Sequence, residues 1–332
     1  MADYFDATML DGWLKRDAIP YFFTRQPFFS KMFNGSQWEV QHGKTGFQWN
    51  VRLSGSQIYS YGSMETFTAT EGGDFATAYL PWGSLYSKIA ISGKKMDRQG
   101  SAGSLDDGTL TPMHAQILSD LKDDFTWRLG TEFADGDGTD VNGGGGAGIY
   151  GYKQSVATSP ATGTYANLSR VTITDHRNQQ FSAAAGPSTS AATDAWWAIL
   201  NGVTTGSRMM GPKGRCKPDT LVAPEGPLVM IKNKGYIQNQ SVGASVNGVI
   251  SIEGMEISEA DDDATAAVVR LLCSKVWKIA SVEPKSKFFK IREINAIQNH
   301  VHEGDAAVVL RTPDFQLVNT FPKANVAITS FS

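Results

Sequence analysis

Two runs of alternating apolar and polar positions lie in the first third of the chain. The first run has its apolar residues at every second position, at Phe47, Trp49, Val51 and Leu53. The second run repeats this period at Leu85, Ser87, Ile89 and Ile91. Alternation of this kind predicts strands with one buried face, so we expect residues 43–93 to form one long hairpin.

The segment between these strands, residues 54–74, is rich in Gly, Ser and Thr but also contains large apolar and aromatic residues. These residues are Tyr59, Tyr61, Met64 and Phe67. A hairpin tip has no core of its own in which to bury such side chains. We therefore expect a neighbouring subunit to cover them.

The clearest helix in the sequence is predicted over residues 112–133, where apolar residues recur at spacings of three and four. This stripe consists of Leu110, Met113, Ile117, Leu121, Phe125 and Leu129. Thr111 is a suitable N-cap, and Pro112 fits the first helical turn. At 1.5 Å per residue the helix would be roughly 33 Å long.

The remaining segments carry weaker patterns. Residues 1–40 are aromatic but aperiodic, and Pro20 and Pro27 interrupt regular pairing, which favours an extended arm packed into a groove of its own or a neighbouring subunit. A second helix is predicted to begin at Thr193. Residues 261–280 fit either a helix or a buried strand, and from Phe288 onward short apolar runs predict β-structure.

Composition indicates a soluble, folded protein. The chain has 332 residues, a formal net charge of −3 and 41% apolar residues, which allows two connected domains and argues against a compactor of nucleic acid. No secretory signal and no apolar stretch of about 18 residues are visible, so we expect a protein made inside the cell and not spanning a membrane. Cys216 and Cys273 lie far apart without a CxxC partner, which favours reduced thiols.

Two segments resemble known ligand-binding motifs, but the spacing of their residues does not match those motifs. Gly143–Gly148 lacks the GK[ST] ending of a phosphate loop, so it is interpreted as a surface loop. Asp135, Asp137 and Asp140 resemble a calcium loop, but Gly146 stands where the bidentate carboxylate should be. A cluster of turn residues is the favoured interpretation, and a weak cation site is the alternative.

Two further candidate sites have ordinary alternatives. His300, His302 and Glu303 could place two imidazoles on one strand face, as in a metal-dependent hydrolase, but no third ligand follows in sequence. An edge strand explains them more simply. The basic row of Lys285, Lys287, Lys290 and Arg292, interleaved with Phe288 and Phe289, could bind single-stranded nucleic acid or form an amphipathic strand. We predict no catalytic residue, no cofactor and no metal site, and hence no enzyme.

The order of these elements resembles the major capsid proteins of tailed bacteriophages, whose Hong Kong 97-like fold also forms encapsulin shells. Five features carry the resemblance. They are the aromatic arm ending in residues 28–33, the hairpin with Glu71-Gly72-Gly73-Asp74-Phe75 and Pro81-Trp82, the helix from Pro112 followed by Gly136-Asp137-Gly138-Thr139, the Ala195–Leu200 segment leading to Lys217-Pro218-Asp219, and the β-rich tail with Phe321-Pro322 and Ile328.

The resemblance implies an α+β capsid fold with four parts. These are an N-terminal arm (1–42), an extended loop hairpin (43–93), a peripheral domain (94–165 and 276–332) containing a spine helix at 112–133, and an axial domain (166–275). It implies inter-subunit contacts through the arm and the loop, for which the candidates are Phe22, Phe23, Phe28, Phe29, Tyr59, Tyr61, Met64 and Phe67. Some relatives crosslink through a lysine on this loop, but no lysine lies between Lys44 and Lys88.

The function implied is structural. Copies would self-associate as pentamers and hexamers into an icosahedral shell around double-stranded DNA, which they would contact non-specifically. The implied partners are a portal, a separate scaffolding protein and a cement protein, and the implied location is the virion, after assembly in the host cytoplasm. The alternatives are an encapsulin-like compartment, a tail or decoration protein of a virion, and the metal-dependent hydrolase.

Overall fold

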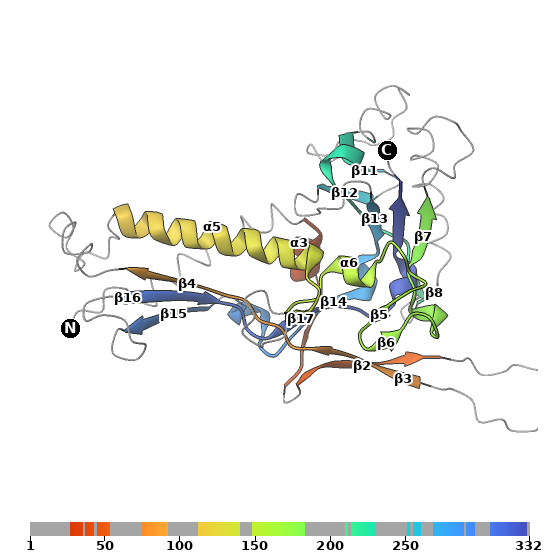
Figure 1. Cartoon of the computed structure of the whole chain (residues 1–332), viewed down its shortest axis with the longest axis horizontal. Helices are drawn as coiled ribbons and strands as arrows, with labels where there is room; N and C mark the ends of the chain where they lie inside the picture. Colours follow the sequence, from red (N-terminus) through yellow and green to blue (C-terminus); the bar gives the residue numbers. More distant parts are fainter. Residues whose placement is uncertain are drawn as a thin grey trace, which may run out of the picture.

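The fold combines helices and sheets, as the sequence predicted (Figure 1). The computed structural model describes residues 27–35, 37–42, 45–53, 75–91, 112–139, 148–182, 210–211, 214–229, 231, 251–252, 255–259, 268–288, 290–295 and 306–330. The helix predicted from Thr193 lies outside these residues and stays a prediction.

A six-stranded sheet forms one end of the molecule, at the right of Figure 1. Its strands, in spatial order, are β11 (Ser251–Ile252), β12 (Met255–Glu259), β10 (Thr220–Ala223), β13 (Val269–Leu272), β18 (Val326–Thr329) and β7 (Gln179–Ser182). The pairs β10–β12 and β18–β7 are parallel, and the other pairs are antiparallel. β10 and β13 are buried throughout, and their residues are apolar except for Thr220 and Arg270.

A three-stranded antiparallel sheet forms the other end, and the long helix α5 (Pro112–Asp135) lies along it (Figure 1). Its strands, in order, are β15 (Lys290–Asn295), β16 (Ala306–Arg311) and β4 (Tyr86–Ile91). Leu121, Phe125 and Leu129 of the predicted stripe are all buried. The helix is therefore confirmed, and it runs two residues beyond the predicted end at Phe133.

The predicted hairpin is wrong in its second strand. β2 (Gly46–Arg52) pairs with β3 (Phe75–Pro81), whereas the alternating run at 85–91 forms β4 and pairs with β16. β3 also alternates, but its inward residues are Ala76, Ala78 and Leu80. Because alanine is a weak signal of a buried face, the more apolar run at 85–91 gives the stronger strand pattern and leads to the wrong pairing.

A third sheet joins the two ends. Its strands are β1 (Trp38–Val40), β14 (Trp277–Ser281) and β17 (Phe315–Asn319). The short helix α3 (Pro27–Asn34) packs against β14 and against the 3₁₀ turn η5 (Ser274–Val276). Strands β13 and β14 thus settle the ambiguous segment, as far as residues 268–280 are concerned, in favour of buried strands.

Smaller elements complete the fold. They are α6 (Tyr152–Ser155), β5 (Thr164–Tyr165), β6 (Leu168–Ser169), β8 (Met210–Gly211), β9 (Gly214–Arg215) and the 3₁₀ turns η3 (Thr174–His176), η6 (Lys285–Lys287) and η8 (Pro322–Ala324).

The main core is aromatic and draws on elements from the whole chain. Phe29 of α3 lies with its ring centroid 4.2 Å from that of Phe133 of α5, and Phe288 lies 4.9 Å from Phe315 of β17. All four side chains are at most 2% exposed. Full burial of a phenylalanine side chain stabilises a fold by about 2–3 kcal/mol, so this cluster is a large local contribution.

A second buried group combines aromatic and polar side chains around His176. The His176 side chain is 1% exposed, its Nε2 lies 3.2 Å from the Tyr165 carbonyl oxygen, and its ring stacks on that of Tyr165. Burial and, to a smaller extent, the nearby Arg170 cation lower the pKa of His176 to about 4. His176 is therefore a structural residue, whereas His42 is exposed.

We predict that His176 makes the fold sensitive to acid. Because the unfolded chain binds a proton at the ordinary pKa of 6.5 and the folded chain only near 4, the free energy of unfolding should fall by up to about 3 kcal/mol as the pH drops through this window. Urea unfolding between pH 7 and 4 measures this slope. His176→Gln should flatten it, and an unchanged slope in that variant would contradict the assignment.

Candidate functional site

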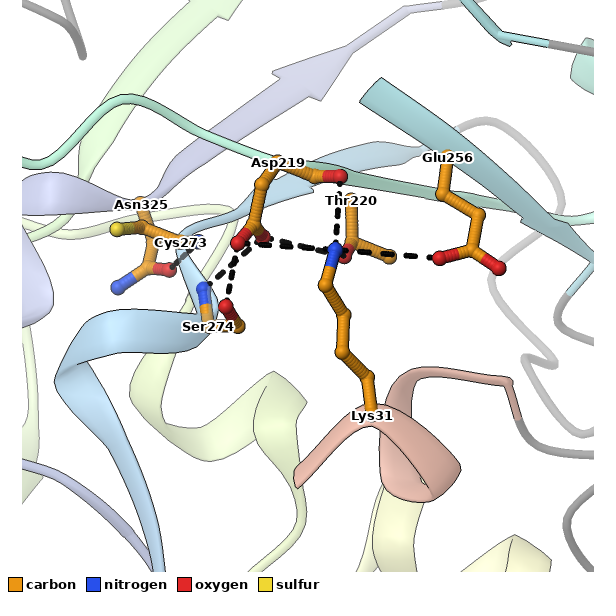
Figure 2. Close-up of polar contacts among 7 residues, drawn as sticks. All are labelled: Lys31, Asp219, Thr220, Glu256, Cys273, Ser274 and Asn325. Carbon is orange, nitrogen blue, oxygen red and sulfur yellow. Dashed lines mark hydrogen bonds and ion pairs between the residues drawn. The ribbon is translucent and has the colours of Figure 1, made fainter. Parts of the chain in front are cut away.

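Lys31 of helix α3 forms ion pairs with two residues at neighbouring strand ends of the six-stranded sheet (Figure 2). Lys31 of α3 places its Nζ 3.6 Å from Asp219 Oδ2 and 3.9 Å from Glu256 Oε2. It also donates hydrogen bonds of 3.3 Å to the Asp219 carbonyl oxygen and to Thr220 Oγ1. We call Lys31, Asp219, Thr220, Glu256 and Ser274 the α3 joint.

The carboxylate of Asp219 is also held in place by residues other than Lys31. Its Oδ1 accepts hydrogen bonds from the Ser274 backbone N–H at 3.0 Å and from Thr220 Oγ1 at 3.2 Å. The Ser274 hydroxyl donates to Oδ2 (Figure 2). Because this carboxylate caps the turn after β13 and also pairs with Lys31, the joint links α3 to two neighbouring strand ends.

A buried asparagine, Asn325, forms hydrogen bonds with residues next to the α3 joint. Asn325 is 0% exposed, and its Oδ1 accepts hydrogen bonds from the Cys273 backbone N–H at 2.9 Å and from Trp277 Nε1 at 3.0 Å. Its Nδ2 donates to the Pro322 carbonyl oxygen at 3.3 Å. The Oδ1 of Asn325 therefore helps to fix the turn that carries Ser274, while its Nδ2 holds the turn before Asn325 itself.

The face of the three-stranded sheet away from α5 is basic. Leu310 of β16 points into the core with α5, so its neighbours Val309 and Arg311 lie on the opposite face. The register places Lys88 opposite Val309, and Tyr86 and Lys290 opposite Arg311. Lys88 and Arg311 are exposed, and neither forms an ion pair within the described part of the chain. We call this surface the basic sheet face.

A groove of about 350 Å³ opens at the end of the basic sheet face. Tyr86 and Arg311 line it from the sheet, and Glu283 and Asp314 line it from the adjoining turns. The Tyr86 side chain is 58% exposed. An aromatic ring beside a guanidinium group is typical of surfaces that bind another protein segment.

The β2–β3 hairpin ends in exposed apolar residues. It extends away from the body of the molecule, at the lower right of Figure 1. Its last pair is Arg52 and Phe75, where Phe75 is 64% exposed, and the next residue, Leu53, is 40% exposed. These two neighbouring apolar side chains are available for contact with another part of the protein or with another chain.

Two of the predicted inter-subunit contacts require correction. Phe28 and Phe29 are 4% and 2% exposed within a single chain, so they have almost no surface left for a neighbour. They lie on a helix and pack into the subunit's own core, where Phe28 contacts the ring of Trp277 edge-on. The other six candidates, Phe22, Phe23, Tyr59, Tyr61, Met64 and Phe67, lie outside the described residues.

The described residues that resembled a metal site have other partners. Asp135 pairs with Lys153, and Asp137 accepts hydrogen bonds from the backbone N–H and the hydroxyl of Thr139, which lower the pKa of Asp137. Within the described residues no group of three potential ligands is placed to hold a metal, and no described helix is long and apolar enough to span a membrane. Asp140, His300, His302 and Glu303 lie outside this part of the chain.

Comparison with known proteins identifies the fold. No protein-family model matches the chain, and no curated protein sequence matches it significantly. The solved structure of a cyanophage A-1(L) capsid asymmetric unit aligns with a TM-score of 0.62 at 15% identity, covering 92% of both chains. The capsid of Myoviridae phage XM1 aligns at 0.53 and 10% identity over 89% of this chain and 90% of that one.

An encapsulin is similar to the same degree. The SrpI encapsulin complex of Synechococcus elongatus PCC 7942 aligns with a TM-score of 0.53 at 10% identity, covering 92% of this chain and 88% of the encapsulin. At these identities the likeness establishes the fold alone. The chain has the Hong Kong 97-like capsid fold, as the resemblance in its sequence predicted.

We predict that Lys31 and Asp219 are energetically coupled. Both side chains are about one-third exposed, so Lys31→Ala should lower the free energy of unfolding by only about 1 kcal/mol. Asp219→Ala should cost about 2 kcal/mol, because the Ser274 backbone N–H loses its acceptor. Urea unfolding of both single variants and the double variant measures the coupling. Strict additivity would show that the joint is not an interacting unit.

Proposed function

We propose that this chain is the major capsid protein of a tailed bacteriophage, and that it self-associates as pentamers and hexamers into an icosahedral shell around double-stranded DNA. The observation that carries the proposal is a capsid fold whose projecting hairpin ends in two exposed apolar residues, Leu53 and Phe75. A subunit that leaves such residues uncovered gains free energy when a neighbour buries them.

The sheets support the proposed division into domains. The three-stranded sheet with α5 corresponds to the peripheral domain and its spine helix, and the six-stranded sheet corresponds to the axial domain. One boundary changes: β18 falls within the range 276–332 that was assigned to the peripheral domain, but it pairs with β13 and β7 of the six-stranded sheet.

The contact between subunits is proposed to join the loop of one copy to the basic sheet face of the next. Residues 54–74 contain Glu65, Glu71 and Asp74 but no lysine or arginine. Lys88 and Arg311 offer the opposite charge, and the groove beside Tyr86 offers an apolar contact. Opposite charges at such a contact set its register and exclude wrong pairings more than they add affinity.

The remaining partners follow from this function. A portal, a separate scaffolding protein and a cement protein would complete the particle, which assembles in the host cytoplasm and is located in the virion. The DNA contact would be non-specific. The second candidate is an encapsulin-like compartment with protein cargo, which the similarity to the SrpI encapsulin favours. Nucleic acid or protein inside purified particles distinguishes the two.

We predict that deleting residues 56–70 abolishes assembly and leaves the subunit folded, because the deletion shortens the loop beyond β2 and β3 and removes no described core residue. Sedimentation velocity measures assembly, and circular dichroism with thermal unfolding measures folding. The control is Val171→Ala, a change at an exposed residue outside the hairpin. Shells formed by the deletion variant would overturn the role of the loop.

We also predict that reversing two charges on the basic sheet face blocks assembly. Lys88→Glu with Arg311→Glu would place carboxylates against the acidic loop of the neighbour, and light scattering should show at least a tenfold loss of assembled particles. The control is Lys275→Glu, which reverses the charge of an exposed lysine outside this face. Adding Glu65→Lys and Glu71→Lys should restore assembly. Normal assembly of the first variant would exclude this contact.

A further inference from the structure

The only two cysteines of the chain meet in the core. Cys216 follows strand β9, and Cys273 lies between β13 and η5. Both are free thiols, 1% and 0% exposed, within one hydrophobic cluster. The two thiols are in hydrogen-bond contact with each other. The sequence predicted two separate reduced thiols, and nothing in their spacing indicated this contact.

The pairing of β10 with β13 brings the two cysteines together. These strands are antiparallel, with Thr220 opposite Leu272, and the Asp219 backbone N–H donates to the Leu272 carbonyl oxygen at 2.9 Å. The chain that leads into β10 therefore runs beside the chain that leaves β13. This places the segment of Cys216 next to that of Cys273. Figure 2 shows Cys273 beside Ser274 of the α3 joint.

We propose that Cys216 and Cys273 are a redox modification site that closes into one intrachain disulfide when the protein meets a thiol oxidant. The reaction balances with a diazene oxidant such as diamide. The thiolate of one cysteine adds to the N=N bond, and the second thiolate then attacks the first sulfur and expels the hydrazine. The two cysteines lose two electrons and two protons, and the oxidant gains them.

Burial determines how this site responds. Desolvation and, to a smaller extent, the neighbouring Cys216 thiol raise the pKa of Cys273 to about 12. Because the thiolate is the reactive form, the pair is slow to react while the core is closed. Oxidation then proceeds through local opening, and a thiol-rich cytoplasm keeps the pair reduced.

The disulfide would act on the α3 joint. Cys273 donates its backbone N–H to Asn325, and the next residue, Ser274, holds the Asp219 carboxylate that pairs with Lys31. A covalent bond at Cys273 therefore fixes the turn that positions Asp219. It also restricts the unfolded chain, so Tm should rise by roughly 5 °C on oxidation.

The test uses the full-length protein treated with diamide, in buffer and in urea just below the unfolding transition. The protein is then unfolded, alkylated without reduction and weighed by mass spectrometry. We expect a monomer that takes up no alkyl group in at least one condition, a peptide map joining Cys216 to Cys273, and the higher Tm after the urea is removed. Reduction should reverse all three.

Cys216→Ser and Cys273→Ser serve as controls. Each should keep one alkylatable thiol after oxidation and show no rise in Tm, even if the substitution itself lowers stability. Two alkylated cysteines in the wild type under both conditions would overturn the proposal. So would a disulfide between two chains, or a bridged monomer whose Tm lies below that of the reduced protein.

Discussion

The aromatic contact between α3 and α5 is the interaction on which the rest of the structure depends. Phe29 packs on Phe133, and Phe288 and Phe315 continue this contact into the sheets. These residues come from both ends and the middle of the sequence. Because the cluster is closed to solvent, it holds α3, α5 and the sheet of β1, β14 and β17 together as one body. Val222, Leu272 and Ala327 of the six-stranded sheet belong to the same buried cluster, and the ion pair of Lys31 with Asp219 in the α3 joint adds a polar contact between α3 and this sheet.

A rigid body of this kind fits the proposed function, in which the subunit acts through the surfaces that it presents to its neighbours. Its surfaces are presented at fixed angles: an apolar hairpin end on one side, and a basic face with a groove on another. If each surface meets the other on the next copy, the contact is heterologous and repeats from subunit to subunit. Closed shells need contacts of this type, and each can be modest because the number of contacts is large.

The sequence predicted those parts of the fold that have a strong local pattern. The helix was predicted at 112–133, close to its observed range, because its apolar stripe is regular. Strand β3 was not predicted, because Ala76 and Ala78 give little apolar contrast. The α3 joint could not be predicted, since no local pattern relates Lys31 to Asp219. Phe28 and Phe29 were assigned to a neighbour because an aromatic run shows the need for burial but not which chain provides it.

Electron microscopy of the purified full-length protein, across a range of salt concentrations, tests the central claim most directly. The proposed function predicts closed particles of uniform diameter, or discrete pentamers and hexamers where assembly is incomplete. Density for the loop of one subunit over the basic sheet face of the next would establish the contact itself. A protein that remains a monomer or dimer under all conditions, also when expressed with a scaffolding protein, would contradict the account.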